Sequence, residues 1–431
     1  MCSEAVTTSD AHRSIEAIWR IESPKVIATV ARIVRDVAIA EDLAQDALVA
    51  ALEQWPREGI PRSPGAWLTT AAKRRAIDTL RRNTRLDRKH AELAYELEAG
   101  RSTESADSHI ALDDDIGDDL LCLIFIACHP VLAPESRLAL TLRLLGGLTT
   151  EEIARAFLVP EPTIAQRIVR AKRTLSKAKA SFEVPSGPER AVRLSAVLEV
   201  IYLVFNEGYS ATAGDDWVRP SLCGEALRLG RILAELMPGE PEVHGLVALM
   251  EIQSSRLRAR LGPAGEPVRL LDQNRALWDR LLIQRGLTAL RRAEALDGTS
   301  GLYVMQAAIA ACHARARTPE ETDWNRITAL YETLAVATRS PIVRLNQAVA
   351  VSMAHGPQAG LDLVDAMASD PALATYPYLP SARGDFLERL GRLNEARGEF
   401  ERAAGLTKNT RERALLLARA HTCALATGKD A

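Results

Sequence analysis

The chain has 431 residues, enough for several domains, and 47% of them are hydrophobic, which excludes an intrinsically disordered protein. The formal net charge of −2 gives no global signal for a polyanionic partner, so a nucleic-acid surface would have to come from local clusters. The six cysteines form no CxxC pair, the first residues lack the apolar core of a signal peptide, and no run approaches the roughly 18 apolar residues of a membrane span, so we expect a cytoplasmic protein.

Apolar residues recur at i, i+3, i+4 and i+7 in segments rich in Ala, Leu, Glu and Arg. This pattern predicts an all-α protein, in which two small helical domains precede a large helical C-terminal region. Changes in composition place the domains at residues 9–90, 118–183, 190–300 and 301–431, with an acidic flexible linker at 91–117.

The first domain contains an acidic helix at residues 39–55. Ile39, Leu43, Ala47 and Ala51 share one helical face and predict its buried side. The polar and acidic side chains lie elsewhere on the helix: Glu41, Asp42, Gln45, Asp46 and Glu53.

A basic helix follows at residues 63–83, with Ser63 as its cap and Pro64 in its first position. Its cations are Lys73, Arg74, Arg75, Arg81 and Arg82. An acidic helix beside a basic helix suggests one surface for a basic protein and another for nucleic acid. Trp67 is the one aromatic residue of this helix, and the alternatives for it are a core position or a base-stacking position.

Residues 147–175 read as a helix-turn-helix. Thr149 caps the first helix with Glu152 near its third position, residues 158–161 form the turn, and Pro162 suits the first turn of the second helix. Ile164, Ile168 and Ala171 predict the buried face of that helix, and the side chains predicted to meet DNA are Thr163, Gln166, Arg167, Arg170, Lys172 and Arg173. The alternative is a solvated basic helix packed on its neighbour.

The C-terminal region shows weak internal repetition. Gly384, Ala396, Phe400 and Ala403 match the small and aromatic positions of a tetratricopeptide unit, and a second set lies about 36 residues earlier, at Ala348, Gly360, Val364 and Met367. A generic helical bundle is the alternative interpretation.

Signals of catalysis or metal binding are weak. Residues 206–216 gather carboxylates near Tyr209, but the sequence has no HExxH, no Gly-rich phosphate loop and no nucleophile elbow, so we expect no enzyme and no cofactor. Cys122, Cys128 and His129 lack a fourth metal ligand and are interpreted as core residues. The arginines at 256, 258 and 260 could bind an anion or form a solvated face.

Taken in this order, the acidic helix, the basic helix and the helix-turn-helix resemble those of an extracytoplasmic-function (group IV) RNA polymerase sigma factor, over about residues 10–180. The resemblance implies binding to the clamp helices of the polymerase largest subunit, by Glu41, Asp42, Gln45, Asp46, Glu53 and Trp55. It implies contacts to the promoter −10 element by Trp67, Lys73, Arg74, Arg75, Arg81 and Arg82. It also implies contacts to the −35 element by Thr163, Gln166, Arg167, Arg170, Lys172 and Arg173.

Two departures concern the DNA-reading helices. Ala165 stands where many members of the family have Lys, and Arg74–Arg75 precede Ala76 where an Asn is common. The promoter sequence therefore cannot be carried over. The acidic linker could imitate a polyanion in the polymerase channel used by RNA, or it could be a solvated tether.

Residues 197–212, 222–233, 241–260 and 340–351 resemble the branch of this family that carries a large tetratricopeptide-like extension. That branch implies a sigma factor without a dedicated membrane anti-sigma factor, and a link to YCII-related (DGPF-type) proteins or another regulator. We therefore expect a transcription initiation factor whose activity is modulated by its C-terminal domain. The alternatives are a helix-turn-helix activator with a helical sensor domain, and a protein-interaction scaffold.

Overall fold

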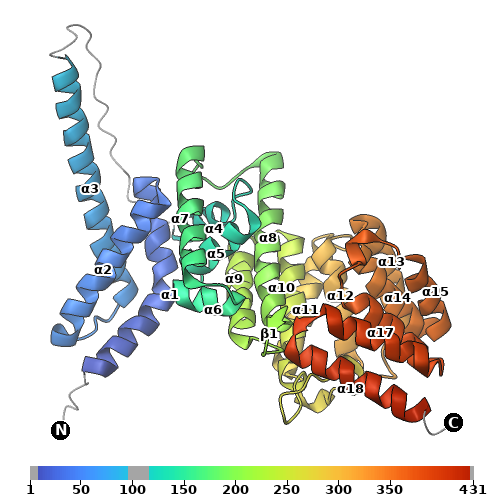
Figure 1. The fold of residues 1–431 in the computed structure, drawn as a ribbon. Coiled ribbons are helices and arrows are strands. Elements are labelled where there is room, and N and C mark those ends of the chain that lie inside the picture. The colour runs from blue at the N-terminus through green and yellow to red at the C-terminus, as the bar shows by residue number, and fades with distance from the viewer. Residues whose placement is uncertain (1–7, 96–115, 428–431) are drawn as a thin grey trace. The chain divides into compact units, whose positions relative to one another are not determined.

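The computed structural model describes residues 8–95 and 116–427 (Figure 1). These residues form 18 α-helices and one pair of two-residue strands, which confirms the all-α prediction. The chain divides into two compact units, residues 1–200 and 201–431, and each is described by itself. Within the described ranges no helix is long and apolar enough to cross a lipid bilayer.

The first unit begins with three long helices, α1 (Thr8–Val34), α2 (Val37–Glu58) and α3 (Pro64–Tyr95). The Asp36 carboxylate caps α2 by accepting hydrogen bonds from the backbone N–H groups of residues 38 and 39. In α2, Leu43, Ala47 and Ala51 are buried as predicted, but the prediction is wrong for Ile39, which is 38% exposed. Ile39 lies in the first turn, where Ala40 faces the core in its place.

Helix α3 begins at Pro64 as expected but runs to Tyr95, past the predicted end at residue 83. No glycine or proline interrupts the chain between Ala66 and Tyr95, so nothing in the sequence stops the helix. The predicted acidic linker of residues 91–117 therefore begins inside a helix, and its middle, residues 96–115, lies outside the described residues.

Four shorter helices follow in the first unit: α4 (Ile116–Ala127), α5 (Pro134–Leu144), α6 (Thr150–Phe157) and α7 (Glu161–Ala178). Thr149 and Glu152 form the predicted capping box at the start of α6, in which each side chain accepts from the other residue's backbone N–H. Leu158 ends α6 in the left-handed region at φ 50°, and Pro162 lies in the first turn of α7. The helix-turn-helix is present as predicted.

Helix α8 (Gly187–Tyr209) spans the boundary between the units. The second unit continues with α9 (Pro220–Leu236), α10 (Pro241–Ser254), α11 (Arg280–Ala295), α12 (Leu302–Arg315), α13 (Trp324–Thr338), α14 (Pro341–His355), α15 (Pro357–Ala366), α16 (Tyr378–Arg389), α17 (Leu393–Leu406) and α18 (Thr410–Thr427). Consecutive helices pack against one another along the whole series, which appears in yellow-green to red in Figure 1.

Small residues set the spacing of these helices. A Cβ added to Gly384 would lie 2.7 Å from the Phe400 ring, and one added to Gly360 would lie 2.4 Å from the Ser352 Cβ. All eight residues predicted from the internal repetition are buried in the α14–α18 region. The alternation of small and large residues therefore serves close packing between neighbouring helices.

Two short strands, β1 (Ala213–Gly214) and β2 (Lys408–Asn409), pair in parallel between distant parts of the second unit. The buried Asn409 side chain strengthens this link, because its Nδ2 donates to the carbonyl oxygens of Ala211 at 3.1 Å and Asp216 at 2.8 Å. The start of α18 is thus held against the loop that follows α8 (Figure 1). The sequence carried no strand signal that predicts this pairing.

Candidate nucleic-acid and polymerase interfaces

Helix α7 presents a polar face built on an apolar base. Ile164, Ile168, Ala171 and Leu175 are buried and fix the helix against its neighbours. Gln166, Arg170 and Arg173 are exposed and, at a spacing of four and three residues, lie on one face of the helix. Thr163 and Arg167 beside them are half-buried. Amide and guanidinium groups on one exposed face are the side chains that read base edges and hold phosphates.

Lys172 is not part of that face. Its side chain is 17% exposed, and its Nζ lies 2.5 Å from Oε2 of Glu41 on α2. In this structure Lys172 therefore pairs with a carboxylate of the first helical block, whereas the sequence pattern had assigned it to DNA.

Glu41 is the centre of a buried polar cluster. It is 3% exposed, and besides Lys172 its carboxylate accepts from Nε of Arg143 at 2.7 Å and from Nε2 of Gln45 at 3.0 Å. Burial by itself would raise the pKa of Glu41, but the charges and hydrogen bonds of Lys172 and Arg143 outweigh it and hold that pKa below its ordinary value of 4.5. The cluster connects α2 with α5 and α7 by charge as well as by packing.

Arg143 was missed by the sequence interpretation. It lies near the end of α5, between the buried residues Leu142 and Leu144. Its NH1 also donates to the Leu148 carbonyl at 3.3 Å, so it anchors the loop before α6 while it pairs with Glu41. A charged residue on a largely buried helix indicates that an internal partner is needed. The sequence does not show which residue that partner is, because Glu41 lies 102 residues away.

The remaining acidic residues of α2 differ in accessibility. Asp42, Asp46 and Glu53 are exposed and so are available for a protein contact, whereas Gln45 is half-buried and donates to Glu41. Trp55 is 3% exposed, and its ring meets Trp67 edge-on with centroids 5.3 Å apart. Glu41 and Trp55 thus lie in the core of this structure and not on the surface of α2.

The basic residues of α3 form an open surface. Arg74, Arg81 and Arg82 are exposed, while Lys73 and Arg75 are half-buried. A groove of about 580 Å³ runs between α2 and α3 next to this surface, and Trp67 lines it together with Arg74 and Arg75. Trp67 therefore packs on the core through Trp55 and also borders a groove.

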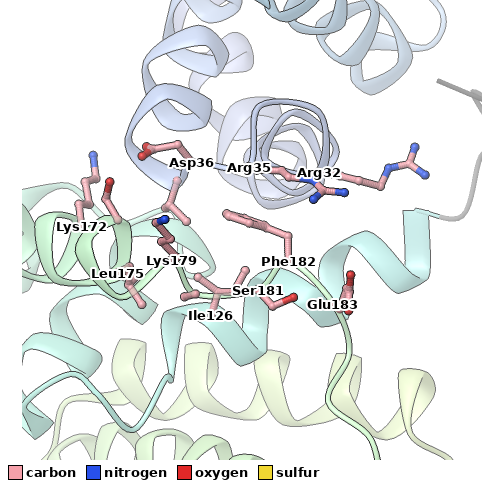
Figure 2. A pocket seen from close by; sticks show the side chains of 13 residues that line it. Arg32, Arg35, Asp36, Ile126, Lys172, Leu175, Lys179, Ser181, Phe182 and Glu183 are labelled. Carbon is pink, nitrogen blue, oxygen red and sulfur yellow. The ribbon is translucent and has the colours of Figure 1, made fainter. Parts of the chain in front are cut away.

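A second hollow, of about 390 Å³, lies where the end of α1 approaches the end of α7 (Figure 2). Phe182 points toward the turn that carries Arg32 and Arg35, and Lys179 projects beside it. Arg32 also pairs with Asp119 of α4 at 3.0 Å. The helical blocks of the first unit are therefore joined by several contacts besides the Glu41 cluster.

The cysteines and carboxylates considered as catalytic or metal sites have structural surroundings. Cys128 is buried next to Thr141, with Sγ and Oγ1 3.3 Å apart, and burial raises the pKa of its thiol to about 11. Glu207 accepts from Arg219 at 2.5 Å and from Thr212 at 2.9 Å. In the part of the chain that the structure describes, no three His, Cys, Asp or Glu residues come together as metal ligands.

Comparison with known families assigns both helical blocks of the first unit. Residues 18–86 match the model of sigma-70 region 2, and residues 122–175 match that of sigma-70 region 4. These two matches, in this order, support a sigma factor. Residues 193–294, the first part of the extension, match a family of unknown function (DUF6596). The expectation of a sigma factor, made from three motifs, is confirmed at this level.

Relatives of this sigma factor differ in how much of it they share. An uncharacterized protein of Rhizobium meliloti is 44% identical over 405 residues, which cover 91% of this chain and 92% of that protein. A probable ECF RNA polymerase sigma factor, SigI, of Mycobacterium tuberculosis is 25% identical over 183 residues, 42% of this chain and 61% of that protein. No solved structure matches the chain.

Proposed function

We propose that this sigma factor is of the extracytoplasmic-function type, binds core RNA polymerase, and directs it to promoters through −35 and −10 elements. The exposed face of α7, with Gln166, Arg170 and Arg173, carries the proposal for the −35 element. The family match of region 4 and the printed name of the M. tuberculosis relative support it. Thr163 and Arg167 would contribute from the edge of this face.

The −10 element would bind the surface of α3, where Arg74, Arg81 and Arg82 are exposed and Lys73 and Arg75 flank them. Neutralising several phosphates there should make binding strongly dependent on salt. Core polymerase would bind the exposed acids of α2, of which Asp42 and Asp46 lie one turn apart on the same face. We propose Glu53 and Gln45 as further members of that surface.

Simultaneous reading of both elements requires the two regions to separate. Helix α2 packs against both DNA-facing helices, α3 and α7. Packed helices have axes about 10 Å apart, so α3 and α7 lie within roughly 20 Å of one another where both contact α2. The −35 and −10 elements are about 25 base pairs apart, or roughly 85 Å at 3.4 Å per base pair. The connection through residues 96–115, at about 3.5 Å per residue, reaches up to roughly 70 Å.

The separated state would free Glu41 and Lys172 for the roles that the resemblance implies. We call the arrangement in which Glu41 pairs with Lys172 the closed arrangement. In it each side chain neutralises the other, so neither would contact polymerase or DNA. We therefore propose that this sigma factor exchanges the Glu41 cluster for contacts with polymerase and promoter. Trp55, buried against Trp67 inside region 2, is not uncovered by this step and would act by supporting the fold of the interface.

Run-off transcription with purified core polymerase and no other sigma factor tests the proposal. The wild-type chain should give promoter-specific products from a pool of genomic promoter fragments. Asp46→Arg should abolish them by placing a cation against the basic clamp surface, whereas Glu58→Arg, a matched reversal at the exposed end of α2, should not. Absence of specific products with the wild-type chain across the pool would refute the proposed function.

A helix-turn-helix activator is the alternative, and the match to region 2 disfavours it, because an activator needs only the DNA-binding half. We propose further that α13–α17 stack as tetratricopeptide-like pairs and that the second unit regulates the first. A YCII-related (DGPF-type) protein is one candidate regulator, supported by the family resemblance alone. A chain ending at residue 200 should keep its DNA determinants but change the activity of its promoters in cells.

A further inference from the structure

Arg256 is a buried cation without an ionic partner. It follows α10 and is 6% exposed, and among the described residues no carboxylate forms an ion pair with it. Its Nε has no hydrogen-bond partner. The guanidinium carbon lies 5.8 Å from the ring centroid of Tyr209, whose side chain also hydrogen-bonds with Arg256, and 5.7 Å from that of Trp278. Such rings attract a cation but do not neutralise its charge.

The groups around Arg256 add positive charge. Burial lowers its pKa, and the neighbouring Arg260 lowers it further, while Tyr209 and Tyr331 act in the opposite direction. Arg275 lies close enough to influence the same site, and its NH1 donates to the carbonyl oxygens of His313 and Ala316 at 2.7 Å each. A buried charge is normally paired, because desolvation of an unpaired ion is costly. The positive charge around Arg256 therefore has no anion to balance it.

A cavity of about 240 Å³ lies at this position, entirely within the second unit. Arg256 and His313 supply its charged and polar wall, and Tyr202 and Tyr331 extend that wall. The other wall is apolar and includes Ile309 and Leu334. At about 30 Å³ per water in the liquid, the cavity has room for a molecule the size of roughly eight waters.

His313 is the second polar group of the cavity without a partner. Its Nδ1 is buried and has no hydrogen bond, and the Trp324 ring holds the imidazole edge-on at 5.1 Å. Burial, with Arg256 and Arg275 nearby, lowers the pKa of His313 to about 3, so the ring is neutral at ordinary pH. A neutral imidazole carries one N–H donor that could complete the binding of an oxygen ligand.

We propose that this cavity binds a small organic carboxylate with an apolar or aromatic body. The carboxylate would pair with the Arg256 guanidinium, whose planar fork matches two carboxylate oxygens, and the body would contact Ile309 and Leu334. A free phosphate fits less well, since its second charge has no further cation in the cavity wall and it leaves the apolar wall uncovered. The site would give the second unit a small-molecule ligand, independently of promoter binding.

Titration calorimetry on the full-length protein tests the proposal with benzoate, phenylacetate and isovalerate as probes. At least one should bind, and its neutral amide should not. Arg256→Gln should weaken that binding at least tenfold. Arg258→Gln is the matched control, since Arg258 is an exposed arginine two residues away, and it should bind as the wild type does. Inorganic phosphate should bind more weakly than the carboxylates.

A second variant separates loss of the site from loss of the fold. Ala310 lines the cavity and is 5% exposed, so Ala310→Phe should fill the space while Arg256 stays in place, and binding should be lost. Without ligand, Arg256→Gln should unfold at a temperature no lower than the wild type, because it removes an unpaired buried charge. Failure of all three probes to bind, equal binding by the amide, or undiminished binding to both variants would overturn the proposal.

Discussion

The carboxylate of Glu41, on the helix proposed to bind polymerase, lies 2.5 Å from the ammonium of Lys172, on the helix proposed to bind promoter DNA. Arg143 shares the same carboxylate at 2.7 Å. Glu41 is 3% exposed, so this ion pair joins α2 and α7 at a point largely shielded from solvent. The closed arrangement of the sigma regions therefore depends on a few identifiable atoms.

Replacing Glu41 by Gln should weaken that arrangement. The change leaves Arg143 and Lys172 without a countercharge in a partly buried site, at a cost on the order of 2 kcal/mol, below the full cost of a broken buried pair because both cations reach solvent in part. Hydrogen exchange of α2 and α7 should become faster, and small-angle scattering should report a larger radius of gyration. Asp42→Asn, at the exposed neighbouring position, should change neither.

The same cluster predicts a dependence on acid. A carboxylate whose pKa is lowered by folding stabilises the folded state above its unfolded pKa, here 4.5, and that contribution is lost as the pH falls through the lower folded pKa. Protection of α7 against hydrogen exchange should therefore fall below about pH 4.5 in the wild type. Glu41→Gln should remove this component of the pH dependence, and an unchanged profile in the variant would contradict the assignment.

Arg170 and Lys172 should differ in DNA binding although both lie on α7. Arg170→Ala removes an exposed cation and should lower the salt dependence of binding to a −35 duplex by about one counterion, with an affinity loss of roughly tenfold. Lys172→Ala should leave affinity unchanged or raise it, because it loosens the contact with Glu41. Fluorescence anisotropy over a salt series measures both, and equal losses would show that Lys172 contacts DNA directly.

Replacing Leu158 by glycine should stabilise region 4. It adopts φ 50° at the end of α6 and is 52% exposed, so its side chain contributes little packing while its backbone is strained. Leu158→Gly should raise the free energy of unfolding by about 0.5 kcal/mol, the net of relieved strain and added chain entropy. Val159→Gly, next in the chain and without the positive φ, should lower it in the same thermal denaturation series.

His313 should make the second unit sensitive to mild acid. Its pKa is about 3 in the folded protein, against 6.5 without burial, so the unfolded chain binds the proton more tightly between these values. Stability should fall as the pH drops from 6.5 toward 3, at up to about 1 kcal/mol per pH unit. Denaturation of His313→Gln should show a smaller slope, while His355→Gln, at an exposed histidine, should behave as the wild type.

Local patterns predicted much of the first unit. The capping box of Thr149 and Glu152, the start of α3 at Pro64 and the buried face of Ile164 and Ile168 follow from residues within one or two turns of each other. Such signals are short in range, and they also sufficed to indicate the sigma family. The predicted helix stopped at residue 83 and the linker was placed from residue 91 on a change in composition, whereas the helix continues to Tyr95.

Interactions between distant residues were not predictable in this way. Glu41 looks like any exposed acid of an amphipathic helix until Arg143, 102 residues later, is placed beside it. The arginines at 256, 258 and 260 form one run in the sequence, but only the first is buried at the cavity and the second is exposed. A sequence pattern shows which residue types are present, whereas tertiary packing decides which of those residues become buried.

The pairing of β1 with β2 changes how the second unit should unfold. An open array of helical hairpins can fray from its last repeat, since each hairpin contacts only its neighbours. Here Asn409 bonds the residues just before α18 to residues 211 and 216, so the last helix is fastened to the beginning of the unit. The terminal hairpin then cannot peel away alone, and the unit should lose its structure in a single cooperative step.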